Sequence, residues 1–143
     1  EQEYTLPIGV ADIKLHGKDV TIVSFGKIIK LAQEAAETLA EEGIDVEIID
    51  LRTVRPIDYD TVIDSVKKTN RLVCLEEAWP LGSISTEIAY MVQKRAFDHL
   101  DAPIVRLTTA DTPAAYAPTL MEAFLPSVDG VIKAVKDAMY LNS

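Results

Sequence analysis

Short runs of apolar residues recur along the chain and alternate with longer segments of helical periodicity. Four runs are rich in β-branched residues and nearly continuous in apolar character: 20–25 (VTIVSF), 46–51 (VEIIDL), 71–76 (RLVCLE) and 103–108 (PIVRLT). Such runs are typical of strands that are covered on both faces. A fifth segment, 11–17 (ADIKLHG), alternates apolar and polar residues and is predicted to form a further strand.

Four other segments follow helical spacing. The first covers 27–42 and ends before Gly43, a residue suited to the left-handed conformation that closes many helices. Asp58 is placed to cap the second helix, and Pro126-Ser127 opens the last. The four apolar faces contain Ile28, Leu31, Ala32, Ala35 and Leu39; Val62, Ile63 and Val66; Ile84, Ile88, Met91 and Val92; and Val128, Val131, Ile132, Val135, Ala138 and Met139.

The alternation of strand and helix predicts a single three-layer α/β/α domain spanning residues 1–143, with a mostly parallel sheet between two helical layers. Only the turn GKD joins 11–17 to the next run. A parallel crossover needs about a dozen residues. The first strand is therefore antiparallel to a strand that directly follows it, or it lies elsewhere in the sheet.

The charge is negative and uneven. The net charge is −9, and residues 31–50 hold seven acids and no base. A surface of this kind repels phosphate backbones, so we expect no nucleic-acid partner. We interpret the acidic segment as a solvated helix face, with a docking surface for a basic partner as the alternative. No apolar run approaches the roughly 18 residues of a membrane span, so we expect no membrane association.

The chain has few soft metal ligands. Cys74 lies inside an apolar run and is its only cysteine, and the two histidines, His16 and His99, are far from it in sequence. Because zinc sites need clustered ligands, a zinc site is not expected, and Cys74 is interpreted as a buried thiol.

Two arginines follow the second apolar run. Parallel sheets of this class bind ligands at the carboxyl ends of their strands, where Arg52 and Arg55 lie. Two guanidinium groups there could clamp a carboxylate or a phosphate. We favour instead ion pairs with Glu76 and Glu77 at the neighbouring strand end.

Glu76 and Glu77 follow the third run directly. Adjacent residues of a strand point to opposite faces, so both carboxylates cannot reach one substrate while the strand continues. No histidine lies nearby to act as a partner in acid–base chemistry. Trp79-Pro80 adds a large rigid anchor of the kind enriched at protein contacts. We therefore predict no catalytic, cofactor-binding or metal-binding residue, and an interface that contains Arg52, Arg55, Glu76, Glu77, Trp79 and Pro80.

A free-standing flavodoxin-like or nucleotide-binding module is the alternative. Gly26 follows the first buried run, and Asp50 lies at a spacing that suits a ribose-binding carboxylate. A dinucleotide fold needs three glycines where this chain has one, and the sequence contains no phosphate loop. The pattern favours an assembly role over this alternative.

Several segments also resemble a known family. PIGVADIKLHGKDVTIVSFG, EIIDLRTVRPIDYDTVIDSVKKTNRLVCLEEAWP, TEIA and FDHLDAPIVRLTTADTPAAYAP are similar to the transketolase C-terminal-like domain in beta subunits of thiamine-diphosphate-dependent 2-oxo acid dehydrogenases. The resemblance covers about residues 4–138 and is most specific over 50–80. Arg55-Pro56 and Trp79-Pro80 look more like the pyruvate dehydrogenases than the branched-chain enzymes.

The resemblance implies a five-stranded mixed sheet with one antiparallel strand, in a piece of a longer beta subunit. The intact enzyme would decarboxylate pyruvate and acetylate the lipoyl group of the acyltransferase component, whereas this domain would be non-catalytic. Thiamine diphosphate and magnesium would be held by other domains, through a Gly-Asp-Gly motif that this sequence lacks. The implied partners are an alpha subunit, a second beta subunit and the dihydrolipoyl acyltransferase core. The implied location is the bacterial cytoplasm or the mitochondrial matrix.

The sequence departs from the family pattern at several positions. It has Ala78, Ser83 and Ser85 where members usually carry glycine, and residues 113–117 read PAAYA where members often read P-x-P-Y-A. Replacing glycine restricts the backbone, so we expect the turn after Glu77 to differ. The same domain of a branched-chain, acetoin or deoxyxylulose-phosphate enzyme stays open as an alternative.

Overall fold

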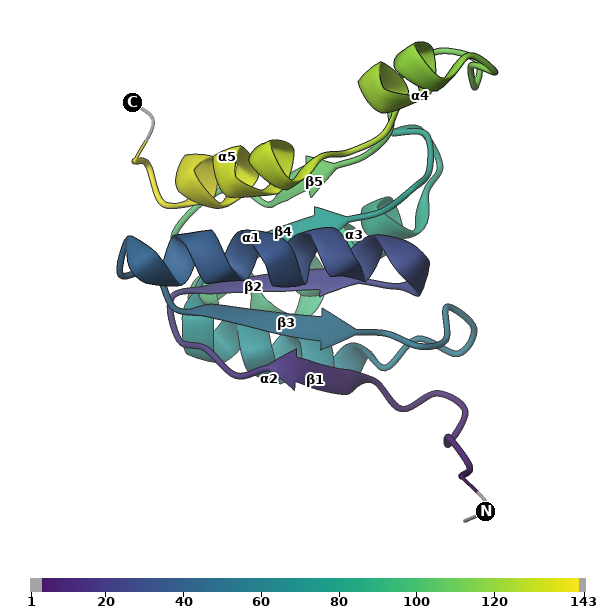
Figure 1. The fold of residues 1–143 in the computed structure, drawn as a ribbon. Helices are drawn as coiled ribbons and strands as arrows, with labels where there is room; N and C mark the ends of the chain where they lie inside the picture. Colours follow the sequence, from purple (N-terminus) through teal and green to yellow (C-terminus); the bar gives the residue numbers. More distant parts are fainter. Residues whose placement is uncertain (1–3, 142–143) are drawn as a thin grey trace.

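The structure is a computed structural model that describes residues 4–141. Five strands form one sheet in the order β1-β3-β2-β4-β5 (Figure 1). Strand β1 runs antiparallel to β3, and the other neighbouring pairs are parallel. The predicted mixed five-stranded sheet is therefore confirmed. The strands are β1 (Asp12–Leu15), β2 (Val20–Ser24), β3 (Val46–Asp50), β4 (Leu72–Leu75) and β5 (Val105–Leu107).

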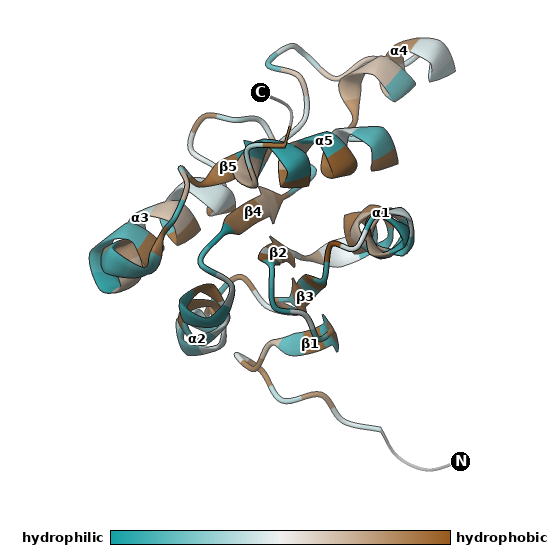
Figure 2. Ribbon diagram, turned by 90° about the vertical axis from the view of Figure 1, so that its left-hand side faces the viewer, coloured by the Kyte–Doolittle hydropathy of each residue, from teal (hydrophilic) through white to brown (hydrophobic). Residues whose placement is uncertain are grey.

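Helices cover both faces of the sheet (Figure 2). Helices α1 and α5 pack on the face that carries Val20, Ile22 and Ile48. Helices α2 and α3 pack on the face that carries Val23 and Ile49. The helices are η1 (Gly26–Ile28), α1 (Ile29–Glu41), α2 (Tyr59–Thr69), α3 (Ile84–Ala96), η2 (Phe97–His99), α4 (Pro118–Phe124) and α5 (Val128–Ala138).

The predicted helix ends agree with the structure. The Asp58 carboxylate accepts the Thr61 N–H at 3.1 Å and begins α2. The Ser127 hydroxyl accepts the Gly130 N–H at 3.1 Å and begins α5. Gly43 follows α1 with a φ of +82°, the left-handed conformation that glycine adopts without strain.

The short connection after β1 allowed two placements: beside the next strand, antiparallel to it, or elsewhere in the sheet. The structure shows the second. Strand β1 lies at the edge beside β3 rather than beside β2, which follows it in the chain. Gly17, in the connection, passes so close to β3 that a Cβ atom there would lie 2.2 Å from the Val46 carbonyl carbon. Only glycine fits where the chain passes this close to β3. Gly17 therefore allows the path of the chain from β1 to β2.

Helix α4 was not predicted. None of its residues is buried, and it projects from the body of the domain beyond β5 and α5 (Figures 1 and 2). Pro118 occupies its first position, where the missing N–H costs nothing. Within residues 4–141, no helix has the length and apolar character needed to cross a bilayer.

Candidate functional site

The four parallel strands end at one edge of the sheet. Strands β2, β3, β4 and β5 finish at Ser24, Asp50, Leu75 and Leu107. All of the predicted site residues follow β3 or β4 at this edge. Because β2 lies between β3 and β4, the edge has two separate parts.

Glu76 is held inside the protein. Glu76 is only 1% exposed. The Ser85 N–H donates to both carboxylate oxygens, at 3.3 Å to Oε1 and 3.2 Å to Oε2. The Ser85 hydroxyl also donates to this carboxylate. These donors lie in the first turn of α3, where the helix dipole favours negative charge. Glu76 therefore fixes the start of α3 and is not presented to solvent.

Arg106 completes this arrangement from β5. Its Nε donates to the Ser85 hydroxyl oxygen at 2.8 Å, and its Nη2 donates to the Pro80 carbonyl and, at 3.2 Å, to the Ser83 hydroxyl. Arg106 was not among the predicted site residues. The available signal was a lone arginine inside the otherwise apolar run PIVRLT.

Glu77 points away from Glu76. Its carboxylate lies 3.3 Å from Lys27 Nζ, near the start of α1, on the opposite face of the sheet from α3. The two glutamates therefore face different helical layers, as the strand geometry predicted. They do not form a catalytic carboxylate pair.

The predicted pairing of the arginines with Glu76 and Glu77 is wrong. Arg52 Nη2 lies 2.7 Å from Asp12 Oδ2 on β1, and Arg55 is exposed. The physical reason is the strand order, because β2 separates the end of β3 from the end of β4. The hydrogen bond from Lys14, together with the charges of Lys14 and Arg52, lowers the pKa of Asp12.

Arg55 lies beside a groove between the start of α2 and the start of α3. The groove has a volume of about 480 Å³, and its walls are mostly apolar apart from Arg55, Tyr59 and Glu87. The Tyr59 hydroxyl donates to Glu87 at 3.2 Å across one end of it. The polar groups of this groove are thus already engaged, except for the exposed guanidinium.

Trp79 connects two loops of the strand-end edge. Its indole Nε1 donates to the Thr112 carbonyl at 2.8 Å, while the residue stays 51% exposed. Thr109 donates to the Ala78 carbonyl through its N–H at 3.1 Å and its hydroxyl at 3.0 Å. The loop after β5 is therefore tied to the loop after β4, and Trp79-Pro80 lies at their junction.

Large apolar side chains stay uncovered around this junction. Leu81 is 90% exposed, Tyr116 is 104% exposed and Leu120 of α4 is 59% exposed. Together with Trp79 they form what we call the strand-end apolar surface. Exposed apolar clusters of this kind mark contact sites in soluble proteins.

The donor groups present do not fit a magnesium diphosphate site. Among residues 4–141, no group of three or more His, Cys, Asp and Glu side chains lies close enough together to hold a metal ion. Glu76 is engaged by Ser85, and Glu77 by Lys27. That this chain binds neither thiamine diphosphate nor magnesium stays a prediction, and no reaction step is assigned to its residues.

The nucleotide-binding alternative gains no support from the geometry. The Asp50 carboxylate accepts the backbone N–H of Arg52 at 2.9 Å, so it closes a local turn. Gly26 has a φ of +72° and begins the short helix η1, without a second glycine in that turn. The Asp50 carboxylate thus holds a turn of the backbone and is not directed at a ligand site.

Comparison with known families agrees with this geometry. The sequence profile of the family described as "Transketolase, C-terminal domain" matches residues 9–131. The chain belongs to this family.

The similar proteins are longer than this chain, which matches only part of each. The chain is 48% identical over 136 residues to "Pyruvate dehydrogenase E1 component subunit beta, mitochondrial" of Dictyostelium discoideum, covering 95% of this chain and 38% of that protein. It is 53% identical over 138 residues to "Pyruvate dehydrogenase E1 component subunit beta" of Rhizobium meliloti (strain 1021), covering 96% and 30%. It is 43% identical over 139 residues to "Acetoin:2,6-dichlorophenolindophenol oxidoreductase subunit beta" of Bacillus subtilis (strain 168), covering 97% and 41%.

A solved structure shows the same fold. The chain superposes on "Split gene transketolase, inactive beta4 tetramer" with a TM-score of 0.86 at 27% identity, covering 98% of this chain and 45% of that one. In every case named, the chain spans less than half of the similar protein.

Proposed function

We propose that this chain is the C-terminal assembly domain of a beta subunit in a thiamine-diphosphate-dependent pyruvate dehydrogenase. The intact enzyme would decarboxylate pyruvate and transfer the acetyl group to a lipoyl group of the acyltransferase component. Identities of 48 and 53% to pyruvate dehydrogenase beta subunits support this assignment. The chemistry would take place on parts of the enzyme that this chain does not supply.

The strand-end apolar surface carries the proposal. Helix α4 has seven residues, none of them buried, and Tyr116 before it is fully exposed. A helix this short is not stable in water by itself, so its stability must come from packing. Covering one large apolar side chain contributes about 1.5–3 kcal/mol. A protein partner that covers Trp79, Leu81 and Leu120 would supply this stabilisation.

The predicted interface residues take two roles in this proposal. Trp79, Pro80 and Arg55 would contact the partner, because they lie at the surface of the strand-end edge. Glu76, Glu77 and Arg52 would hold the loops in place, since each already has a partner within the domain. Loops that are already held by contacts within the domain suit a preformed docking surface.

The cofactors, partners and location follow from the same proposal. Thiamine diphosphate and magnesium would bind elsewhere in the enzyme, with an alpha subunit, a second beta subunit and the dihydrolipoyl acyltransferase as partners. The enzyme would work in the cytoplasm of a bacterium or in the mitochondrial matrix. The tetrameric state of the solved split-gene transketolase supports a role for this domain in subunit contacts.

An acetoin-cleaving enzyme is the second candidate. The 43% identity to the acetoin oxidoreductase beta subunit of Bacillus subtilis favours it over other members of the superfamily. Rates of the reconstituted enzyme with pyruvate, acetoin and branched-chain 2-oxo acids separate the two candidates. A preference for pyruvate supports the first, and a preference for acetoin replaces it with the second.

Association with the companion subunit tests the proposal. Trp79→Ala and Leu120→Ser in the full-length polypeptide are expected to raise the dissociation constant about 30-fold or more, the effect of losing an interface hot spot. Leu15→Ser is the control, since Leu15 is 42% exposed on β1, away from α4. Unchanged affinity in both strand-end variants would overturn the proposal.

A further inference from the structure

Residues 110–125 leave the body of the domain after β5 and return to it before α5. The segment contains α4 and projects beyond the sheet (Figures 1 and 2). None of its residues is fully buried, and neither of the two apolar cores contains one of them. We call this segment the strand-end lobe.

The two ends of the lobe lie together. The Ala110 N–H donates to the Phe124 carbonyl at 2.9 Å. Directly after the lobe, Pro126 is buried and lines one groove together with Ile28 and Leu31 at the start of α1. Surface loops of about 6–16 residues with joined ends form compact units that are often functional. The lobe is thus attached to the domain at a single base.

One hydrogen bond holds the lobe to the domain beyond this base. The Trp79 indole Nε1 donates to the Thr112 carbonyl at 2.8 Å. Within the described part of the chain, no other hydrogen bond or ion pair joins residues 111–123 to the rest of the domain. The indole N–H is therefore in the position of a latch.

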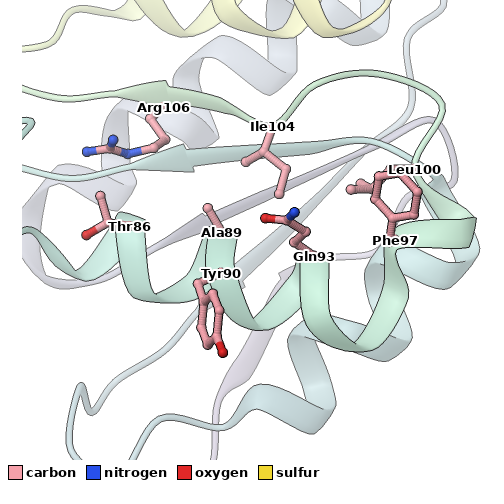
Figure 3. A pocket seen from close by; sticks show the side chains of 8 residues that line it. All are labelled: Thr86, Ala89, Tyr90, Gln93, Phe97, Leu100, Ile104 and Arg106. Carbon is pink, nitrogen blue, oxygen red and sulfur yellow. The ribbon is translucent and has the colours of Figure 1, made fainter.

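The loop that carries the indole is itself held in place. Figure 3 shows Arg106 extending from β5 toward the start of α3. Its Nη2 donates to the Pro80 carbonyl and, at 3.2 Å, to the Ser83 hydroxyl. Trp79 therefore lies on an anchored loop, whereas Thr112 lies on a segment with few attachments.

Helix α4 contributes little stability of its own. It has seven residues, and Ala117 before it supplies no side-chain cap. Isolated helices shorter than about 12–15 residues are marginal in water. The closed position of the lobe thus depends on its base and on the latch.

We propose that the strand-end lobe opens and closes as a unit while the rest of the domain stays folded, and that the Trp79–Thr112 hydrogen bond is its latch. Segments with few buried contacts open at a lower free energy than the core. Closure places Leu120 within the strand-end apolar surface, and opening removes it. A partner that covers this surface would therefore hold the latch closed, a coupling that rests on the proposed function.

Hydrogen exchange at increasing urea tests the opening in the full-length polypeptide. Exchange of residues 117–125 is compared with exchange of β2 by mass spectrometry, below the unfolding transition. The lobe is expected to exchange at least about 100-fold faster than β2. Its rate should depend little on urea, because its opening exposes little surface. Equal rates and equal urea dependence in both segments would overturn the proposal.

Trp79→Phe tests the latch. It keeps an aromatic ring and removes the indole N–H, so exchange in 117–125 is expected to rise about threefold to tenfold, the effect of one hydrogen bond. Tyr116→Phe is the matched control, because the Tyr116 hydroxyl has no hydrogen-bond partner and its loss should leave the exchange unchanged. Unchanged exchange in Trp79→Phe would overturn the latch.

A glycine substitution in α4 tests whether the lobe opens by itself. Ala123 is exposed on α4, and Ala123→Gly is expected to speed exchange in 117–125 about fivefold, because glycine weakens a helix. Ala40→Gly makes the same change at an exposed position of α1 and should leave exchange of the lobe unchanged. Equal acceleration by both variants would show that the lobe opens only with the domain.

Binding of the companion subunit separates this inference from the proposed function. Wild-type affinity in Trp79→Ala and Leu120→Ser removes the proposed function, and the opening of the lobe stands on its exchange rates. Lost affinity in a polypeptide whose lobe exchanges only with the core removes the lobe and keeps the proposed function. Where both hold, saturating companion subunit is expected to slow exchange of the lobe about tenfold or more. An unchanged rate would overturn the coupling.

Discussion

Ser85 donates its hydroxyl hydrogen to the Glu76 carboxylate and accepts a hydrogen bond from Arg106 Nε at 2.8 Å. One small side chain thus links the end of β4, the first turn of α3 and the edge strand β5. The serine hydroxyl bridges the buried Glu76 carboxylate and the half-buried Arg106 guanidinium.

Ser85→Ala is expected to destabilise the fold by about 1–3 kcal/mol, because the buried Glu76 and the half-buried Arg106 each lose a hydrogen bond. The free energy of unfolding is measured by urea titration. Thr38→Ala, at an exposed position of α1, serves as the control and is expected to change stability by less than about 0.5 kcal/mol. Equal stability of the two variants would contradict the buried network.

A second buried carboxylate lies toward the other end of the sheet. Glu47 is 1% exposed and accepts hydrogen bonds from Ser65 Oγ at 2.5 Å, from Lys68 Nζ and from the Gly17 N–H at 3.4 Å. Burial raises the pKa of Glu47, but the hydrogen bonds from Lys68, Ser65 and Gly17 outweigh it and leave the pKa below its ordinary value of 4.5.

This lowered pKa predicts acid sensitivity. Below the ordinary value of 4.5, the unfolded chain binds a proton that folded Glu47 does not, so stability falls as pH drops toward and through the folded pKa. Glu47→Gln is expected to be less stable at neutral pH and to lose part of the decline in stability that sets in as the pH falls through 4.5. Glu37→Gln, an exposed position on α1, is the control and should keep the wild-type pH profile.

Cys74 is expected to resist thiol reagents in the native protein. Burial raises its pKa to about 12, with a further rise from the charge of Glu76 and an opposing effect of Arg106. At about pH 8 almost no thiolate is present, so labelling by a disulfide reagent should proceed only as fast as the protein unfolds. A Thr38→Cys, Cys74→Ser variant places the thiol on the surface and should react at once. Fast labelling of native wild-type protein would contradict the burial.

Asp58 links the cap of α2 to the segment before β1. Its Oδ1 accepts the Thr61 N–H at 3.1 Å, and its Oδ2 accepts the Ala11 N–H at 2.9 Å. Asp58→Ala is expected to cost about 1–2 kcal/mol and to speed hydrogen exchange at the Ala11 amide. Ser127→Ala removes the cap of α5 and is the matched control, because it should cost about as much without changing exchange at Ala11. Equal exchange in both variants would show that Asp58 acts as a cap alone.

Patterns within single segments predicted the fold well. The continuous apolar runs became β2 to β5, and the caps at Asp58 and Ser127 and the glycine after α1 form as expected. These features depend on neighbours in sequence. The short turn after 11–17 also limited the placement of β1 correctly.

Features that depend on the order of strands were harder to predict. The expected pairing of Arg52 with the glutamates failed because no local signal shows that β2 lies between β3 and β4. Arg106 lies 21 positions after Ser85 in the sequence. Nothing in the sequence around Glu76 indicates that this arginine contacts the same serine. Helix α4 was missed because it has only seven residues, none of them fully buried, which is too short for a clear helical period.

Calorimetric titration of this chain with thiamine diphosphate in the presence of Mg²⁺ tests the central claim most directly. If the domain serves assembly and the chemistry belongs to other parts of the enzyme, the titration shows no saturable heat. A single site with a dissociation constant of about 1 μM, weakened by Glu77→Gln, would contradict the account.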